Sequence, residues 1–258
     1  MVKGIDVSTH QKTVNWTKVA ASGIDFAMIK ATQGRGEGVT TRYLRRFTDS
    51  QFKRNIEGAS AAGLAVGVYH YMTAQTLAEA IEEADYFCDT IEPYRDKITL
   101  WAAADVESSM YLGKLSREAL TAVTRRFMDI VAYRGYKPML YTNPDHLVYR
   151  FTPDTFRDDD IWLASWTAKP LVDMPKMRIW QYGAGRVDGI TPKCDLNYGY
   201  FELPERGYKV GDKYTIKAGD TYINGIAVPT RLVGREYTIM QVRDSDILLG
   251  EINSRVKI

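Results

Sequence analysis

Two carboxylates stand one residue apart at the end of an apolar run, in the stretch LWAAADVESS at residues 100–109. If this run is a strand, Asp105 and Glu107 point to the same face, ~6–7 Å apart along the backbone. At an effective dielectric of ~20, two unit charges ~6 Å apart repel by roughly 2.8 kcal/mol, or about two pK units. The spacing therefore predicts one carboxyl that keeps its proton at neutral pH beside an ionised partner, the combination that glycosidic bond cleavage requires.

Other polar and aromatic residues occupy comparable ends of apolar runs. Asp6 follows the first run and Asp195 lies in the last, and the runs between them carry Lys30, Tyr69, Tyr141, Trp166 and Gln181. A D-x-E triplet alone is also compatible with ordinary residues near a loop, but its coincidence with two further acids favours a site. Because aromatic faces stack on sugar rings and carboxylates supply acid–base chemistry, an acidic and aromatic rim favours a carbohydrate substrate.

The elements that would position these residues alternate between strand and helix patterns. Strand-like runs span residues 3–9, 26–34, 64–72, 99–107, 137–143, 160–166, 177–183 and 194–199. Helical stripes lie between them at 49–63, at 76–91 with a Thr76–Glu79 capping box, and after Ser116. About eight strands in alternation predict an α/β fold, an irregular TIM-like (β/α) barrel, parallel and closed, with its chemistry at the carboxyl ends of the strands. The later units leave little room for helices, so irregularity is expected in the second half.

The pattern changes at LPERG, residues 203–207, after which about 50 residues show only short β-like runs. These runs are residues 213–217, 221–225, 235–242 and 246–252, with a strong turn signal at Asn224-Gly225. We therefore predict two domains, a catalytic (β/α) barrel over 1–203 and a small all-β domain over 207–258.

Composition narrows the class of protein further. The 258 residues are 45% hydrophobic and 26% charged with a net charge of +2, which indicates a folded protein and gives no reason to expect a nucleic-acid partner. No apolar stretch approaches ~18 residues, so no membrane insertion is expected. The two cysteines lie far apart in the sequence, so no disulfide framework is expected. The first ten residues, MVKGIDVSTH, do not have the pattern of a signal peptide, so synthesis in the host cytoplasm is expected. The three histidines are not spaced as metal ligands, and no metal or cofactor is expected.

Nine segments, in order, resemble glycoside hydrolase family 25, which includes lysozymes of the N,O-diacetylmuramidase type in many phage endolysins. The segments are GIDVSTHQ (4–11), FAMIKATQG (26–34), FTDSQFKRN (47–55), AAGLAVGVYHY (61–71), AADVES (103–108), YTN (141–143), WLASW (162–166), IWQYG (179–183) and CDLN (194–197). The resemblance covers about residues 1–203. It implies hydrolysis, with retention, of the β-1,4 bond between N-acetylmuramic acid and N-acetylglucosamine in bacterial peptidoglycan.

By the same resemblance, Glu107 is the general acid/base. Asp105 stabilises the developing positive charge, either directly or by orienting the substrate's acetamido group as internal nucleophile. Asp6 and Asp195 complete the acidic cluster, and the implied sugar contacts are Lys30, Tyr69, Tyr141, Trp166 and Gln181. One departure is Gln33, where the family usually has Glu, which removes some negative potential from the site.

The tail, from about Gly207 to Ile258, resembles the SH3-like cell-wall-binding modules attached to such lysins. It implies a cell-wall ligand for this domain, although Arg255 stands where the usual pattern has Trp. A tail that only stabilises or dimerises the enzyme is the alternative. A leaderless lysin is expected to reach the wall through a phage holin.

Two other functions compete with a muramidase. A chitinase-like endo-N-acetylglucosaminidase also places acids after a strand, but such enzymes carry a longer D-x-x-D-x-D-x-E run, and residues 100–104 are apolar here. A non-catalytic cell-wall-binding protein with a decayed barrel is the third possibility, which the intact D-x-E disfavours.

Overall fold

A computed structural model describes residues 1–36, 44–204, 208, 210–243 and 245–257. The chain divides into two compact units, Met1–Pro204 and Glu205–Ile258, each with apolar clusters of its own. Gly207, where the sequence analysis begins the second domain, lies outside the described residues.

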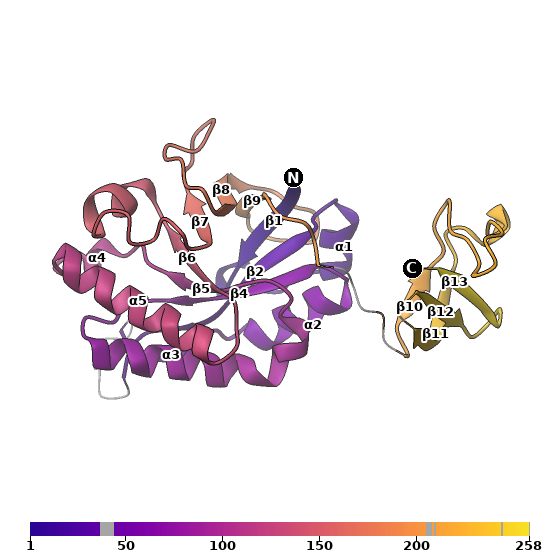
Figure 1. Cartoon of the computed structure of the whole chain (residues 1–258), viewed down its shortest axis with the longest axis horizontal. Helices are drawn as coiled ribbons and strands as arrows, with labels where there is room; N and C mark the ends of the chain where they lie inside the picture. Colours follow the sequence, from indigo (N-terminus) through magenta and orange to yellow (C-terminus); the bar gives the residue numbers. More distant parts are fainter. Residues whose placement is uncertain (37–43, 205–207, 209, 244, 258) are drawn as a thin grey trace. The chain divides into compact units, whose positions relative to one another are not determined.

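The larger unit is a closed barrel of eight strands (Figure 1). In spatial order these are β1 (Val2–Val7), β9 (Cys194–Gly199), β8 (Met177–Gly185), β7 (Ile161–Ala164), β6 (Pro138–Thr142), β5 (Ala102–Asp105), β4 (Ala65–Tyr71) and β2 (Phe26–Gln33). A parallel pairing between β1 and β2 closes the ring, and the short strand β3 (Phe47–Thr48) pairs with β2.

The expectation of an all-parallel barrel is wrong for the last strand. β9 runs antiparallel to both of its neighbours, β8 and β1. A parallel crossover needs a connection of about a dozen residues or more, whereas only residues 186–193 separate β8 from β9. The short connection therefore returns the chain in the opposite direction.

Three long helices cover one side of the barrel, α2 (Phe52–Ala61), α3 (Leu77–Ile91) and α5 (Arg117–Tyr133) (Figure 1). The short helices are α1 (Trp16–Ala21) and α4 (Ser109–Leu112), with 3-10 turns η1 (Thr9–Gln11) and η2 (Glu92–Lys97). Between β6 and β7 the described chain forms a π-helical turn, η3 (His146–Arg150), and no helix lies between β7 and β8 or between β8 and β9. The second half of the barrel is thus irregular.

Strand periodicity decides which side chains face the inside of the barrel. The interior cluster includes Phe26 and Met28 of β2, Ala103 of β5 and Ile179 of β8. Because side chains alternate along a strand, the next inward positions toward the carboxyl ends are Lys30, Asp105 and Gln181. The apolar interior therefore ends in a polar layer at that end of the barrel.

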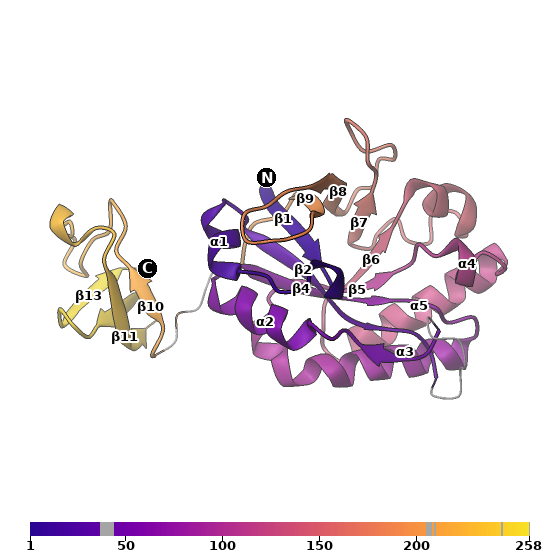
Figure 2. The same cartoon turned by 180° about the vertical axis from the view of Figure 1, so that it is seen from behind.

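The smaller unit is a four-stranded antiparallel sheet (Figure 2). Its strands are β10 (Lys213–Thr215), β11 (Glu236–Arg243), β12 (Asp246–Leu249) and β13 (Ser254–Lys257), with a 3-10 turn η4 (Thr230–Leu232) before β11. The run predicted as a strand at 221–225 makes only isolated bridges, Thr221 with Ala227 and Tyr222 with Val256. Tyr214, Ile239, Ile247 and Val256 lie in a core that this unit forms by itself.

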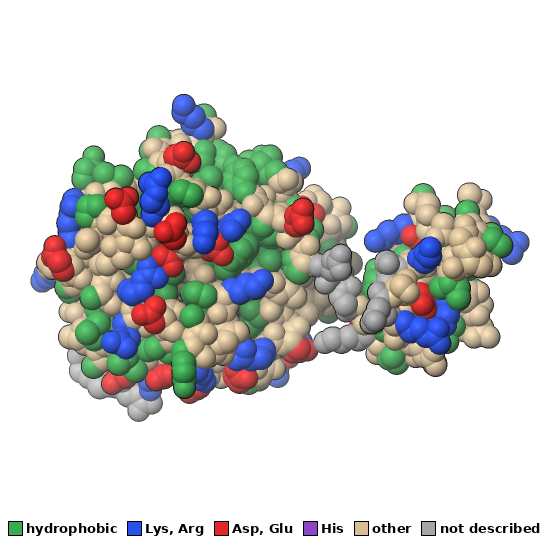
Figure 3. Space-filling view, viewed as in Figure 1, with side chains coloured by type: hydrophobic (Ala, Val, Ile, Leu, Met, Phe, Trp, Pro, Cys, Tyr) green, Lys and Arg blue, Asp and Glu red, His purple; other side chains and the backbone are tan. Residues whose placement is uncertain are grey.

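The visible surface of the larger unit carries interspersed basic and acidic side chains, without a field of one sign (Figure 3). Among the described residues, no helix has the length and apolarity needed to cross a bilayer.

Candidate active site

The barrel brings the four predicted carboxylates to one end, although they are far apart in the sequence. Asp6 and Asp195 are cross-strand partners on β1 and β9. Asp105 ends β5, between Tyr71 of β4 and Tyr141 of β6. The charge of Glu107 is close enough to raise the pKa of both Asp105 and Asp6, so the four acids form one cluster.

Asp105 and Glu107 differ sharply in their surroundings. Asp105 is 5% exposed, and its Oδ1 has no hydrogen-bond partner in the described part of the chain. Glu107 lies beyond the end of β5 and is solvent accessible, so the two do not both stand on a strand as predicted. The pair therefore combines a buried carboxylate, whose Oδ1 has no partner among the described residues, with an accessible one.

Desolvation is the first cause of the raised pKa of both acids. Burial raises the pKa of Asp105 well above its ordinary value, and repulsion from Glu107 adds to that rise. The pKa of Glu107 is also raised by desolvation, while a hydrogen bond from Tyr141 and the charge of Lys30 lower it. For Asp105 the repulsion invoked from the spacing is therefore a secondary cause, and its deeper burial favours Asp105 over Glu107 as the holder of a proton that the two acids share.

Two amide side chains hold Asp6. Its Oδ2 accepts hydrogen bonds from Gln181 Nε2 at 3.0 Å and from Asn197 Nδ2 at 2.8 Å. Burial, then the charge of Asp195, raises the pKa of Asp6 to about 7 in spite of these bonds. Desolvation also raises the pKa of Asp195. The sequence analysis named Gln181 but missed Asn197 as a site residue.

The three predicted aromatic residues, Tyr69, Tyr141 and Trp166, lie near the carboxylates but are buried to different extents. Tyr69 and Tyr141 are buried and pack edge-on against Trp162 inside the barrel, with ring centroids 5.8 Å and 4.4 Å from it. Trp166 lies two residues beyond the end of β7 and is 58% exposed. The Trp166 ring is therefore accessible from solvent, whereas the rings of Tyr69 and Tyr141 are enclosed by the barrel.

Lys30 brings the opposing charge. Its Nζ donates to Gln33 Oε1 at 2.6 Å and lies 4.9 Å from the ring centroid of Tyr71. Desolvation lowers the pKa of Lys30, and the charges of Asp105, Asp49 and Glu107 counteract that effect. Gln33 is thus an acceptor for Lys30, and Tyr71 is a second residue of the site that the sequence analysis missed.

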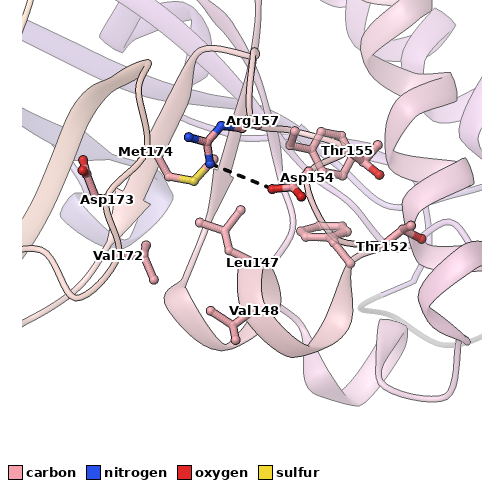
Figure 4. Close-up of a pocket in the computed structure, with 11 residues that line it drawn as sticks. Leu147, Val148, Thr152, Asp154, Thr155, Arg157, Val172, Asp173 and Met174 are labelled. Carbon is pink, nitrogen blue, oxygen red and sulfur yellow. Dashed lines mark ion pairs between the residues drawn. The ribbon is translucent and has the colours of Figure 1, made fainter.

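A separate cavity of about 290 Å³ lies beside η3 and contains none of these residues (Figure 4). Its apolar lining includes Leu147, Phe151, Phe156, Val172 and Met174. Arg157 and Asp154 form an ion pair at its rim, with 4.0 Å between Nη1 and Oδ1. Both are well exposed, so this cavity lacks the desolvated acids that the barrel end has.

The cluster at the barrel end has the chemistry of a glycosidase site. It pairs an accessible acid with a buried one, raises the pKa of both, and places an exposed aromatic ring nearby. In the described ranges, no group of three or more His, Cys, Asp or Glu side chains is arranged to hold a metal ion.

Comparisons with known proteins agree with this chemistry. The autolytic lysozyme of Clostridium acetobutylicum is 31% identical over 219 residues, 84% of this chain and 60% of that protein. An N,O-diacetylmuramidase of Arthroderma benhamiae is 34% identical over 149 residues, 56% of this chain and 58% of that protein. The aligned part of this chain thus spans about 60% of each of these relatives.

A solved structure has the same fold. The family 25 glycosyl hydrolase from Bacillus anthracis superposes with a TM-score of 0.64 at 26% identity, covering 78% of this chain and 90% of that one. Residues 5–190, most of the larger unit, match the sequence profile of Glycosyl hydrolases family 25. The chain therefore belongs to glycosyl hydrolase family 25.

Proposed function

We propose that this chain is a lysozyme that hydrolyses, with retention, the β-1,4 bond between N-acetylmuramic acid and N-acetylglucosamine in peptidoglycan. The observation that carries the proposal is the pair of Asp105 and Glu107, one buried and one accessible, both with raised pKa. The family and the two relatives, a lysozyme and an N,O-diacetylmuramidase, support the substrate.

In this proposal Glu107 is the general acid/base. Its accessible carboxyl protonates the oxygen that leaves with the departing sugar, and then removes a proton from the attacking water. The charge of Asp195 raises the pKa of Asp6 and Glu107, and the charge of Asp6 raises that of Asp105, so the cluster favours retained protons. Lys30 limits that effect, because its charge lowers the pKa of both Asp105 and Glu107.

Asp105 acts on the substrate's acetamido group. Its unpartnered Oδ1 is an acceptor for the acetamido N–H. A hydrogen bond donated to a carboxylate favours its ionised form, so substrate binding lowers the pKa of Asp105 and moves the shared proton to Glu107. Substrate binding thereby protonates Glu107, and ionised Asp105 stabilises the positive charge that develops on the substrate.

Mass spectrometry of the muropeptides released from purified cell walls tests the proposal. We expect new reducing ends on muramic acid, and NMR of the fresh product should show the β-anomer first. Reducing ends on N-acetylglucosamine would instead support a chitinase-like specificity. Glu107→Gln should abolish release without loss of wall binding, and unchanged release by this variant would remove Glu107 from the mechanism.

We further propose that residues 207–258 are an SH3-like module that binds a cell-wall ligand, and that the chain is of the phage-endolysin type. The four-stranded sheet with its own apolar core supports a separate binding unit. The site of action is then the bacterial wall, reached from the host cytoplasm through a holin.

A further inference from the structure

A chain of hydrogen bonds links the exposed Trp166 to Glu107 through two buried side chains. Trp166 Nε1 donates to Gln181 Oε1 at 2.9 Å. The Tyr141 hydroxyl lies 3.3 Å from the same oxygen and also 3.3 Å from Glu107 Oε2. Tyr141 is 7% exposed and Gln181 is 3% exposed, so the contact between them is buried, whereas the contact of the hydroxyl with the accessible Glu107 is partly buried.

The orientation of the Gln181 amide follows from its neighbours. Its Nε2 faces Asp6 Oδ2 at 3.0 Å and Asp195 Oδ2 at 3.5 Å, and both of those atoms are acceptors. The opposite orientation would place the NH2 group against the indole N–H, a donor against a donor. Gln181 Oε1 therefore faces Trp166 and Tyr141 and can accept from both.

The Tyr141 hydroxyl has one hydrogen and two acceptors at equal distance. When Glu107 is ionised, the hydroxyl donates to the carboxylate, because a charge-assisted bond is the stronger one. When Glu107 carries a proton, its own O–H donates to Tyr141, and the hydroxyl hydrogen turns to Gln181. The direction of this hydroxyl thus changes with the charge of Glu107.

We propose that Trp166 and Gln181 are positioning residues that set the protonation of Glu107 through the Tyr141 hydroxyl. The bond from Trp166 makes Gln181 Oε1 a poorer acceptor for Tyr141, because this oxygen already accepts a hydrogen bond from the indole N–H. It therefore favours the state in which Tyr141 donates to an ionised Glu107. A sugar that turns the exposed indole away from Gln181 frees that acceptor and favours the protonated acid.

This inference rests on the proposed role of Glu107 and adds a link between the exposed Trp166 and Glu107. Six other groups also act on Glu107, and they come from five different strands. They are Asp105 on β5, Lys30 on β2, Asp195 on β9 and Asp6 on β1, with Tyr69 and Tyr71 on β4. None of these lies in the path from Trp166 to Tyr141, so their effect is common to the variants compared below.

The test is a titration of the Glu107 side chain by carbon-13 NMR in the full-length protein without substrate, with Glu107→Gln to assign the signal. Trp166→Phe keeps a ring but removes the N–H, and should raise the titration midpoint by about 0.3–0.5 pH unit. Tyr141→Phe should abolish that shift, so that Trp166→Phe has no effect in its background. A midpoint shift of this size converts to roughly 0.4–0.7 kcal/mol.

Trp180→Phe is the matched control, because the Trp180 indole donates to the carbonyl of Ser165 and not to Gln181. We expect it to leave the midpoint unchanged. An unchanged midpoint in Trp166→Phe, an equal shift in Trp180→Phe, or a shift that persists with Tyr141→Phe would each overturn the proposal. Because this readout needs no turnover, failure of the proposed lysozyme activity is seen separately, as absence of muropeptide release.

Discussion

The ammonium group of Lys30 partly offsets the negative charge of the site. Its removal tests whether neighbouring charges set the pKa values of Asp105 and Glu107. Its charge lowers the pKa of Asp105 and Glu107. Lys30→Met should therefore raise both pKa values and move the pH profile of muropeptide release upward, by up to about one unit for one lost charge. Lys53→Met, at an exposed helix position, should leave the profile unchanged, and a profile in Lys30→Met that moves down would contradict the account.

Asp6 links the site to the stability of the barrel. Its pKa is raised from 3.8 to about 7 in the folded protein, so the folded state keeps a proton that the unfolded chain has lost. The stabilisation is complete below pH ~4 and is lost as pH rises through about 7. In wild type the unfolding free energy should fall between pH 4 and pH 8. In Asp6→Asn it should fall by less, the difference being up to about 4 kcal/mol.

Asparagine fits this position, because Gln181 and Asn197 both donate to one oxygen of Asp6. Urea unfolding at the two pH values measures the change, with the exposed Asp158→Asn as control. The same pH dependence in wild type and Asp6→Asn would show that Asp6 does not hold the proton.

Strand periodicity predicts which carboxylates belong to the candidate site, but it does not predict how strongly each is desolvated. The ends of apolar runs point to Asp6 and Asp105. Asp195 was expected at the carboxyl end of the last run, but it is the second residue of β9 and reaches the site because β9 runs antiparallel to its neighbours. Burial depends on partners far along the chain, such as Gln181 and Asn197, which lie 175 and 191 residues from Asp6. Desolvation therefore could not be read from the D-x-E spacing, which shows only the repulsion.

At the level of elements, helix ends are predicted better than helix faces. The capping box of Thr76 and Glu79 opens α3 as expected. Within the helical stripe expected at 76–91, the apolar Leu77 and Ile81 are 45% and 39% exposed, while Glu83 is fully buried. Local hydrogen bonds fix a helix start, whereas the buried face depends on which strands and helices pack against it.

Glu83 is buried because it holds the segment that follows β4. Its Oε1 accepts from the Thr73 backbone N–H at 2.9 Å and from the Thr73 hydroxyl at 2.7 Å, and its Oε2 lies 3.3 Å from His70 Nε2. Glu83→Ala leaves these donors unsatisfied and should cost about 3 kcal/mol of unfolding free energy in urea titrations. Glu82→Ala, at an exposed neighbouring position, should cost less than about 0.5 kcal/mol, and equal effects would contradict this role.

On the scale of the whole molecule, alternation of strands and helices predicts the closed barrel but not the direction of its last strand. The direction of β9 depends on the length of the β8–β9 connection and on pairing with β1, at the other end of the chain. The strand β13 was missed for a similar reason. Its residues, Ser254–Lys257, include a single buried apolar side chain, Val256, and gain their structure from pairing with β12.

The two units have separate apolar cores, so their functions can be tested apart. A protein of residues 1–204 keeps every strand of the closed barrel and all four carboxylates. It should release muropeptides from solubilised peptidoglycan at a rate within about twofold of the full chain, because the catalytic groups lie within this unit. It should sediment several-fold less with intact cell walls, because the proposed binding module is gone. Equal sedimentation of the two proteins, each carrying Glu107→Gln to prevent lysis during the assay, would assign wall binding to the barrel alone.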